Sequence, residues 1–103
     1  MSRAVGDEFE DMIHSILGDI NKTTNSGAKY NNGDFSNYDF IIEAKVKSTF
    51  KKFKVVDKEL EKLKSQARMR LKDWIYIQRT ESGDEVLMDL GTFATLWKAL
   101  HNK

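Results

Sequence analysis

Three residues near the middle of the chain, Asp34, Glu43 and Lys45, have the types and spacing needed to hydrolyse a phosphodiester bond with a metal ion. Residues 40–46 alternate in a period of two, which predicts a strand with Glu43 and Lys45 on one face, about 7 Å apart. Mg²⁺ prefers oxygen ligands and keeps several waters, so two carboxylates can hold it and leave room for a substrate. A lysine beside them could orient or activate the attacking water.

The Glu-x-Lys pattern is weak by itself, because 7 Glu and 13 Lys in 103 residues give about one such triplet by chance. The alternative is a solvent-facing ion pair on an exposed sheet. The setting favours a site, since the triplet ends a hydrophobic strand nine residues after Asp34 and precedes a basic stretch. A third carboxylate could come from the first helix, where Glu8 and Glu10 flank the apolar stripe on opposite sides.

Composition restricts the kinds of metal site and nucleophile that the chain can form. The chain is expected to form one domain over residues 1–103, with 40% hydrophobic and 32% charged residues. The lack of Cys excludes disulfides, thiolate zinc sites and cysteine nucleophiles, and only His14 and His101 could supply imidazole. Any metal must therefore bind carboxylates, as Mg²⁺ does.

No apolar run approaches the ~18 residues of a membrane span and no signal peptide is evident, so we expect an intracellular, cytoplasmic protein without a membrane partner.

The elements that must position these residues follow from periodicity and turn signals. Helices are predicted over 3–17, from about 57 to 71, and over 92–101; strands over 40–46, 74–79 and 85–89; a short edge strand within 47–56; and a loop or short irregular hairpin over 21–39. Asp57 is placed as the N-cap of the second helix, and Asn32-Gly33 as a tight turn. This order predicts a small α/β sheet with flanking helices.

Apolar spacing assigns an inward face to each predicted helix. The inward residues are Val5, Phe9, Met12, Ile13, Ile16 and Leu17 on the first helix, Leu60, Leu63, Ala67 and Leu71 on the second, and Phe93, Leu96, Trp97 and Leu100 on the last. Trp74 and Trp97 are accordingly placed in the core.

Charge is distributed unevenly along the chain. Residues 45–72 carry eleven Lys or Arg and three Asp or Glu, whereas the remainder carries six and thirteen. This asymmetry indicates a cationic surface for an anionic partner beside an acidic zone. The alternative is a lysine-rich helix face that is simply solvated.

A set of basic residues around the proposed site could bind a DNA backbone, which dominates nucleic-acid affinity. Its members are Lys29, Lys47, Lys51, Lys52 and Lys54, with Arg68 and Arg70 as further candidates beside Gln66. Phe50 and Phe53 lie among these lysines in the sequence. The alternative makes the two rings core residues of an edge strand and the lysines guards against edge-to-edge pairing.

Several short motifs in the same order resemble the PD-(D/E)XK nuclease superfamily, and within it the small Holliday-junction resolvases and related phage nucleases. They are Gly6–Glu10 (GDEFE), Ser26–Ala28 (SGA), Gly33–Asp34 (GD) and Ile42–Lys45 (IEAK). The resemblance extends over about residues 3–90. It implies a restriction-endonuclease-like mixed sheet flanked by helices.

The resemblance also implies roles for individual residues. The helix glutamate falls on Glu10, the metal-binding aspartate on Asp34, the second acidic ligand on Glu43 and the catalytic lysine on Lys45, with the carbonyl of Ala44 as a further ligand. The implied cofactor is Mg²⁺, for which Mn²⁺ can substitute, and no small-molecule cofactor is implied. The chain departs from the family pattern where Gly33 replaces the motif's proline, where Asp11 replaces a basic residue, and in its short Asp34–Glu43 spacing.

We therefore expect a Mg²⁺-dependent endonuclease that acts on DNA, with four-way junctions as the implied substrate. Symmetric cleavage of a junction needs two active sites, so a homodimer is expected. Two alternatives belong to other classes: a catalytically silent DNA-binding or regulatory module on the same fold, and a protein-interaction domain with a coincidental motif. Convergence of Asp34, Glu43 and Lys45 in space would disfavour the interaction domain.

Overall fold

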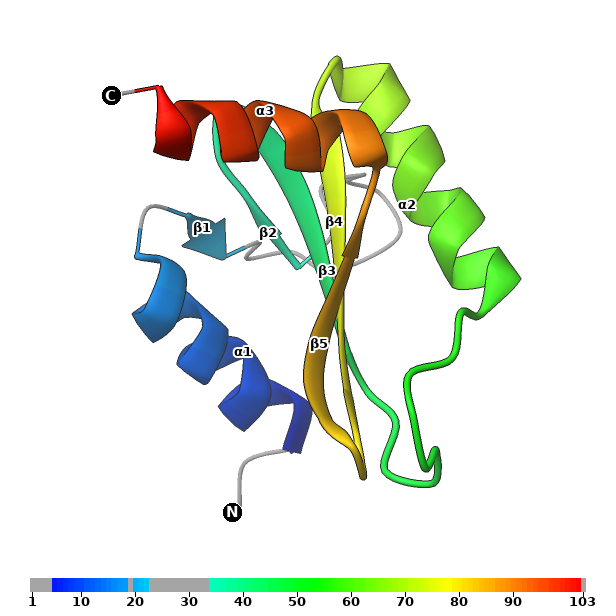
Figure 1. The fold of residues 1–103 in the computed structure, drawn as a ribbon. Helices are drawn as coiled ribbons and strands as arrows, with labels where there is room; N and C mark the ends of the chain where they lie inside the picture. Colours follow the sequence, from blue (N-terminus) through cyan, green and yellow to red (C-terminus); the bar gives the residue numbers. More distant parts are fainter. Residues whose placement is uncertain (1–4, 19, 23–33, 103) are drawn as a thin grey trace.

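The computed structural model describes residues 5–18, 20–22 and 34–102 of the chain. In these residues the elements are α1 (Val5–Leu17), β1 (Asn21–Lys22), β2 (Phe35–Ser36), β3 (Phe40–Val46), α2 (Asp57–Arg70), β4 (Asp73–Thr80), β5 (Gly83–Met88) and α3 (Leu90–His101). They form a small α/β domain whose sheet separates α1 from α2 (Figure 1).

The described strands form one five-stranded mixed sheet in the order β1-β2-β3-β4-β5. Its central strands β3 and β4 run parallel, with Glu43 beside Tyr76 and Lys45 beside Gln78. Helix α2 makes the crossover that a parallel pair requires. The remaining neighbours pair antiparallel. The small α/β sheet predicted from the element order is therefore confirmed, and it is mixed, as the family resemblance implies.

Alternate residues of β3 face opposite layers of the domain. On the α1 side, the buried cluster comprises Phe9, Ile13, Ile20, Phe35, Ile42, Ala44 and Ile77. On the α2 side, it comprises Ile41, Leu63, Ala67 and Tyr76, with Phe53, Trp74 and Leu87 packed against it. The period of two predicted for residues 40–46 is therefore confirmed, and it places Glu43 and Lys45 on the α2 side.

Both ends of α2 differ from the sequence-based prediction. The N-cap is Val56, in extended conformation and without a side-chain hydrogen bond, so the prediction of Asp57 as N-cap is wrong. At the other end, Leu71 adopts a left-handed conformation with φ 56°, and its N–H bonds to carbonyls of the last turn. This C-cap geometry turns Leu71 outward, leaving it 94% exposed instead of in the core.

Residues 47–56, all of which are described, form a loop without a strand, so the predicted edge strand is wrong. A turn begins where the N–H of Phe50 donates to the carbonyl of Lys47. Farther along, the Gln78 side chain binds both backbone polar groups of Lys54 at 2.9 and 3.1 Å. A side-chain amide thus takes the place of a neighbouring strand.

The segment predicted as a loop or irregular hairpin contains the two short strands β1 and β2, which pair antiparallel. The proposed Asn32-Gly33 turn lies outside the described residues. No helix within the described ranges is long and apolar enough to cross a membrane.

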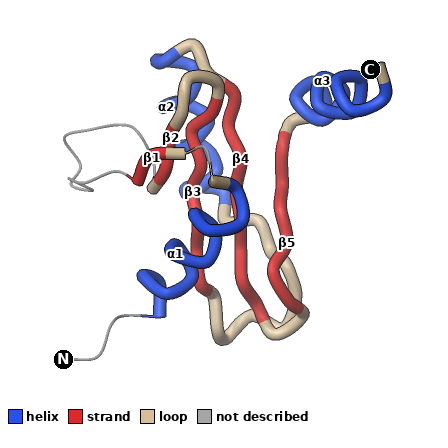
Figure 2. The backbone as a smooth tube through the Cα atoms, turned by 90° about the vertical axis from the view of Figure 1, so that its left-hand side faces the viewer, coloured by secondary structure: helices blue, strands red, loops and turns tan. Residues whose placement is uncertain are grey.

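Helix α3 does not cover the sheet. It extends from the end of β5 and lies beyond that edge strand (Figure 2). The four residues predicted to face inward are 41–62% exposed: Phe93, Leu96, Trp97 and Leu100. The inward face and the core role of Trp97 are therefore wrong, as is the inward placement of Ile16 and Leu17 at the exposed end of α1.

Candidate active site

Asp34 is held against the edge of β3 by two hydrogen bonds. Its N–H donates to the carbonyl of Ile42 at 3.0 Å, and its Oδ2 accepts from the N–H of Ala44 at 2.8 Å. Because β2 is only two residues long, its pairing with β3 covers Ile41 and Ile42. The next backbone donor on this edge, the N–H of Ala44, has no strand partner within the described residues. The Asp34 carboxylate accepts its hydrogen bond instead.

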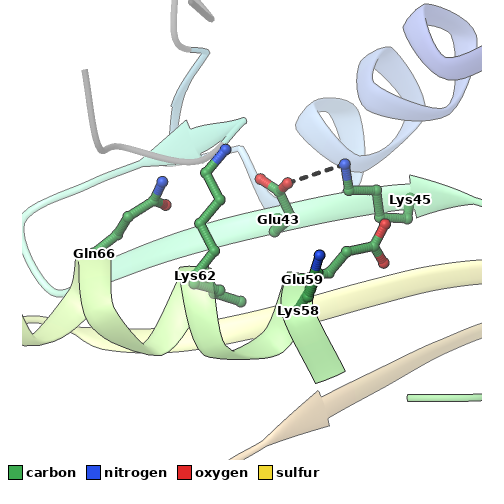
Figure 3. Close-up of a pocket in the computed structure, with 7 residues that line it drawn as sticks. Glu43, Lys45, Lys58, Glu59, Lys62 and Gln66 are labelled. Atoms are coloured by element: carbon green, nitrogen blue, oxygen red, sulfur yellow. Dashed lines mark ion pairs between the residues drawn. The ribbon is translucent and has the colours of Figure 1, made fainter. Parts of the chain in front are cut away.

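Glu43 and Lys45 lie on the neighbouring face of the same strand. The Lys45 Nζ is 3.3 Å from Glu43 Oε2, an ion pair drawn as a dashed line in Figure 3. Both side chains are partly shielded from solvent, and Glu43 is close enough to Asp34 for their carboxyl groups to interact directly. Asp34, Glu43 and Lys45 thus converge, as the sequence predicts.

The electrostatics of this group favour additional positive charge. Burial, and then the negative charge of Asp34, raise the pKa of Glu43, although Lys45 opposes the shift. Burial also raises the pKa of Asp34, against the hydrogen bond from Ala44 and the charge of Lys45. Two carboxylates therefore share a partly desolvated site with one lysine, which leaves them incompletely compensated.

Glu10 is the helix carboxylate that faces this group. Burial and the charge of Asp34 raise its pKa, while Lys22, whose Nζ is 3.6 Å from Glu10 Oε1, lowers it. Glu8 is exposed on the same helix. The structure therefore distinguishes two residues that helix geometry left equivalent, and it brings Glu10 toward Asp34.

The donor chemistry of this site fits a hard cation. No cluster of three Asp, Glu, His or Cys side chains with metal-binding geometry occurs within the described residues. Asp34 and Glu43 supply carboxylate oxygens, however, and the Ala44 carbonyl points to the same side of β3 as its N–H, toward Asp34. Mg²⁺ is commonly held by one or two carboxylates and retained waters, so this set would suffice for it.

A pocket of about 190 Å³ lies between β3 and α2 beside the ion pair. Its lining residues are Glu43, Lys45, Lys58, Glu59, Lys62, Leu63 and Gln66 (Figure 3). Lys58, Lys62 and Gln66 are four residues apart on α2 and so lie along one face of the helix. The pocket therefore joins an acidic strand to a mostly cationic helix face.

Gln66 is a buried amide at one end of this pocket. Its exposed fraction is 7%, and its side chain has no hydrogen-bond partner within the described parts of the chain. A buried amide without a partner costs roughly 1–3 kcal/mol. A ligand in the pocket that offers an acceptor or donor would remove that cost.

A polar network links the pocket to the basic loop 47–56. Glu59 accepts hydrogen bonds from Lys47 Nζ at 2.8 Å and from the Tyr76 hydroxyl at 2.7 Å, and the same hydroxyl accepts from Gln78 Nε2 at 3.0 Å. Burial alone would raise the pKa of Glu59, but these two donors outweigh it and lower the pKa. Gln78 then binds the backbone of Lys54. The network fixes the loop relative to the pocket.

The proposed DNA-binding residues divide into several groups. Lys47 is bound to Glu59, so its charge already has a partner. Lys51, Lys52 and Lys54 are exposed on the loop and Arg68 on the last turn of α2, whereas Lys29 lies outside the described residues. The structure does not bring Arg68 into the pocket.

Lys58, Lys62 and Glu59 line the pocket, although no motif in the sequence points to a role for them. The four-residue spacing of Lys58 and Lys62 can be read from the sequence. The face of α2 that lies over Glu43, however, is set by the crossover between β3 and β4. Spacing of four residues in a helix that follows the Glu-x-Lys strand is the signal that could have identified the two lysines.

No protein-family model, no curated protein and no solved structure matches the chain. A functional assignment therefore depends on the residues and geometry described above.

Proposed function

We propose that the protein is a Mg²⁺-dependent endonuclease that hydrolyses phosphodiester bonds in DNA. The observation that carries the proposal is the meeting of Asp34 with Glu43 and Lys45, of which the last two line a pocket whose other wall carries Lys58 and Lys62. Acidic oxygens suit a divalent cation, whereas the lysines suit the phosphates on either side of the bond to be cut.

Asp34 and Glu43, with the carbonyl of Ala44, would hold the ion. The bound ion supplies charge neutralisation at the phosphate and lowers the pKa of a water that it coordinates. Lys45 adds a fixed positive charge beside the reacting phosphate. Burial would lower the pKa of Lys45, but Glu43, Glu59 and Asp34 outweigh burial and raise it, so the side chain is protonated at neutral pH.

The substrate would lie along the pocket and the basic loop. Lys58 and Lys62 would contact backbone phosphates, and the unpartnered amide of Gln66 would donate to a phosphate or sugar oxygen. Lys51 and Lys52 on the loop would extend this contact along the strand. The arrangement is consistent with the restriction-endonuclease-like core that the sequence motifs imply, and with branched DNA as substrate.

The second candidate, a catalytically silent DNA-binding module, is favoured by one observation. The ammonium of Lys45 lies against Glu43, where it competes with a cation for the carboxylate. In this alternative the lysine would replace the metal permanently, and the cationic pocket would bind DNA without cutting it.

One experiment separates the two candidates. The purified protein is incubated with supercoiled plasmid, linear duplex and a synthetic four-way junction in EDTA, Mg²⁺ or Mn²⁺. We expect cleavage only with a divalent ion, greatest on the junction, and lost in Glu43→Gln. Metal-independent binding to all three substrates without cleavage in either ion would establish the silent module instead.

A further inference from the structure

Helix α3 carries a stripe of large apolar side chains that the described residues of its own chain leave largely exposed. Leu90, Phe93, Leu96, Trp97 and Leu100 are between 41% and 79% exposed, and Thr92 is the buried residue of the helix. The rings of Phe93 and Trp97 are 5.9 Å apart, so the stripe is a continuous surface. A stripe of this size on one helix is typical of a contact surface.

A matching apolar groove lies elsewhere on the domain. It has a volume of about 180 Å³ and is lined by Phe9, Met12, Ile13, Ile16, Leu17, Ile77, Asp84 and Val86. Ile16, Leu17 and Val86 are 70%, 48% and 53% exposed. The groove lies where α1 leaves the edge strand β5 uncovered.

Helix α3 cannot reach the groove of its own chain. A single residue, Asp89, separates Met88 at the end of β5 from Leu90 at the start of α3. The carboxylate of Asp89 accepts from the N–H of Gly91 at 2.9 Å and caps the helix where it leaves the sheet. Most strand–helix connections have two to six residues, so this one-residue connection leaves too little chain for α3 to fold back beside Val86. Figure 2 shows α3 beyond β5 and away from α1.

We propose that two copies of the chain exchange α3, each helix packing its apolar stripe into the groove between α1 and β5 of the other copy. A reciprocal exchange is closed and symmetric, and it satisfies both surfaces without leaving either exposed. This dimer does not depend on the proposed nuclease activity.

The exposed area is sufficient for a stable dimer. Eight large apolar side chains contribute, five on α3 and three in the groove. At roughly 100 Å² for each half-exposed side chain, they offer on the order of 800 Å² per copy, the size of a standard interface.

The test uses sedimentation velocity on the full chain over a range of concentrations. Trp97→Glu changes the stripe and Val86→Glu changes the groove, while Ile16→Glu is a second groove variant on a different element. Each should raise the dimer dissociation constant by about tenfold or more, because a carboxylate would be buried among apolar groups. Ser15→Glu and Thr95→Lys, which alter exposed positions off these surfaces, should leave it unchanged.

Mixing distinguishes exchange from other modes of association. An equal mixture of Trp97→Glu and Val86→Glu should form a mixed dimer, because one intact stripe meets one intact groove. A wild-type protein that remains monomeric at every concentration would overturn the proposal. So would a dimer that Trp97→Glu disrupts while both groove variants leave it intact, since that result means direct α3–α3 pairing. A monomer whose Trp97 fluorescence responds to both groove variants would show that α3 occupies its own groove.

Discussion

The Oδ2 atom of Asp34 accepts a 2.8 Å hydrogen bond from the backbone N–H of Ala44, the residue between Glu43 and Lys45. One carboxylate therefore closes the edge of the strand that carries the other candidate residues. This contact positions Asp34 without using both of its oxygens. It also explains how an acid nine residues earlier in the chain reaches Glu43, since no full strand separates them.

Removing the charge of Asp34 or of Glu43, the two proposed metal ligands, should abolish cleavage and preserve the fold. Asn at position 34 can still accept from the Ala44 N–H, so Asp34→Asn should keep the local geometry. Loss of the carboxylate charge should reduce Mg²⁺-dependent cleavage by orders of magnitude, as should Glu43→Gln. DNA affinity should be unchanged or higher, because a negative charge near phosphate is lost. Cleavage and filter-binding assays on the same samples check this, and full cleavage by Asp34→Asn would contradict the site.

Stability without metal should depend on pH in a defined direction. The folded-state pKa values of Glu43 and Asp34 are raised, mainly by burial, so the folded protein holds their protons to higher pH than the unfolded chain does. The contribution of these two groups to the free energy of unfolding in EDTA should therefore fall as pH rises from about 4, the ordinary carboxyl pKa, through their raised folded-state pKa values.

Substitution isolates that contribution from those of other groups. Relative to wild type, Glu43→Gln should gain stability as pH rises through this window, because the glutamine never ionises. Urea unfolding at a series of pH values measures the difference. Glu85→Gln, on the exposed part of β5, serves as the matched control. Parallel pH curves for wild type and Glu43→Gln would show that burial of Glu43 has no energetic consequence.

The fold around β3 could be predicted because local pattern and tertiary environment agree there. Residues 40–46 alternate with a period of two, and each face of β3 does pack against a different helix. The loop 47–56 could not be predicted, because its stability comes from Gln78, a residue more than twenty positions later that binds the backbone of Lys54. Basic and aromatic residues in that loop resemble a strand pattern in sequence.

The position of α3 could not be predicted from its sequence pattern, for a different reason. A stripe containing Phe93 and Trp97 has the same periodicity whether it packs on its own sheet or on another molecule. Periodicity predicts that the helix exists but does not name its partner. The cationic wall of the pocket was missed for a related reason, since the rotation of α2 that brings Lys62 over Glu43 is set by packing of Leu63 and Ala67.

The lysines of α2 should dominate the salt dependence of DNA binding. The double variant Lys58→Ala/Lys62→Ala should lower affinity and flatten the slope of log K against log salt by about two. The double variant Lys64→Ala/Lys98→Ala removes the same charge away from the pocket and should change the slope less. Equal slopes for the two double variants would mean that DNA does not use the pocket.

The Tyr76 hydroxyl should contribute measurably to stability. It donates to Glu59 at 2.7 Å and accepts from Gln78 at 3.0 Å, and the residue is 1% exposed. Tyr76→Phe would keep the ring but remove one hydrogen bond from Glu59 and one from Gln78, which keep their bonds to Lys47 and to the Lys54 backbone. The free energy of unfolding should fall by about 1.5–3 kcal/mol, as expected for a hydrogen bond to a charged group. Tyr38→Phe, at a residue that is 91% exposed, should change nothing measurable in the same urea titration.

Lys45 tests whether the site is catalytic, because the proposed mechanism needs its charge for cleavage and not for binding. Its ammonium is 3.3 Å from Glu43 Oε2, and its pKa is raised, since Glu43, Glu59 and Asp34 outweigh burial. A lysine held protonated acts through its charge and not as a proton acceptor. Lys45→Met should therefore lose cleavage by orders of magnitude while Mg²⁺ and DNA still bind.

The conservative variant distinguishes charge from proton transfer at this position. Lys45→Arg keeps the charge but does not release a proton, so it should recover a substantial part of the single-turnover rate on a four-way junction. Recovery by Lys45→Arg but not by Lys45→Met would establish an electrostatic role. If both variants were equally inactive, Lys45 would have to transfer a proton, which requires the ion to lower its pKa against the pull of Glu43 and Asp34. Near-native rates in Lys45→Met would reduce the Glu43–Lys45 pair to an ordinary ion pair at the mouth of a cationic pocket.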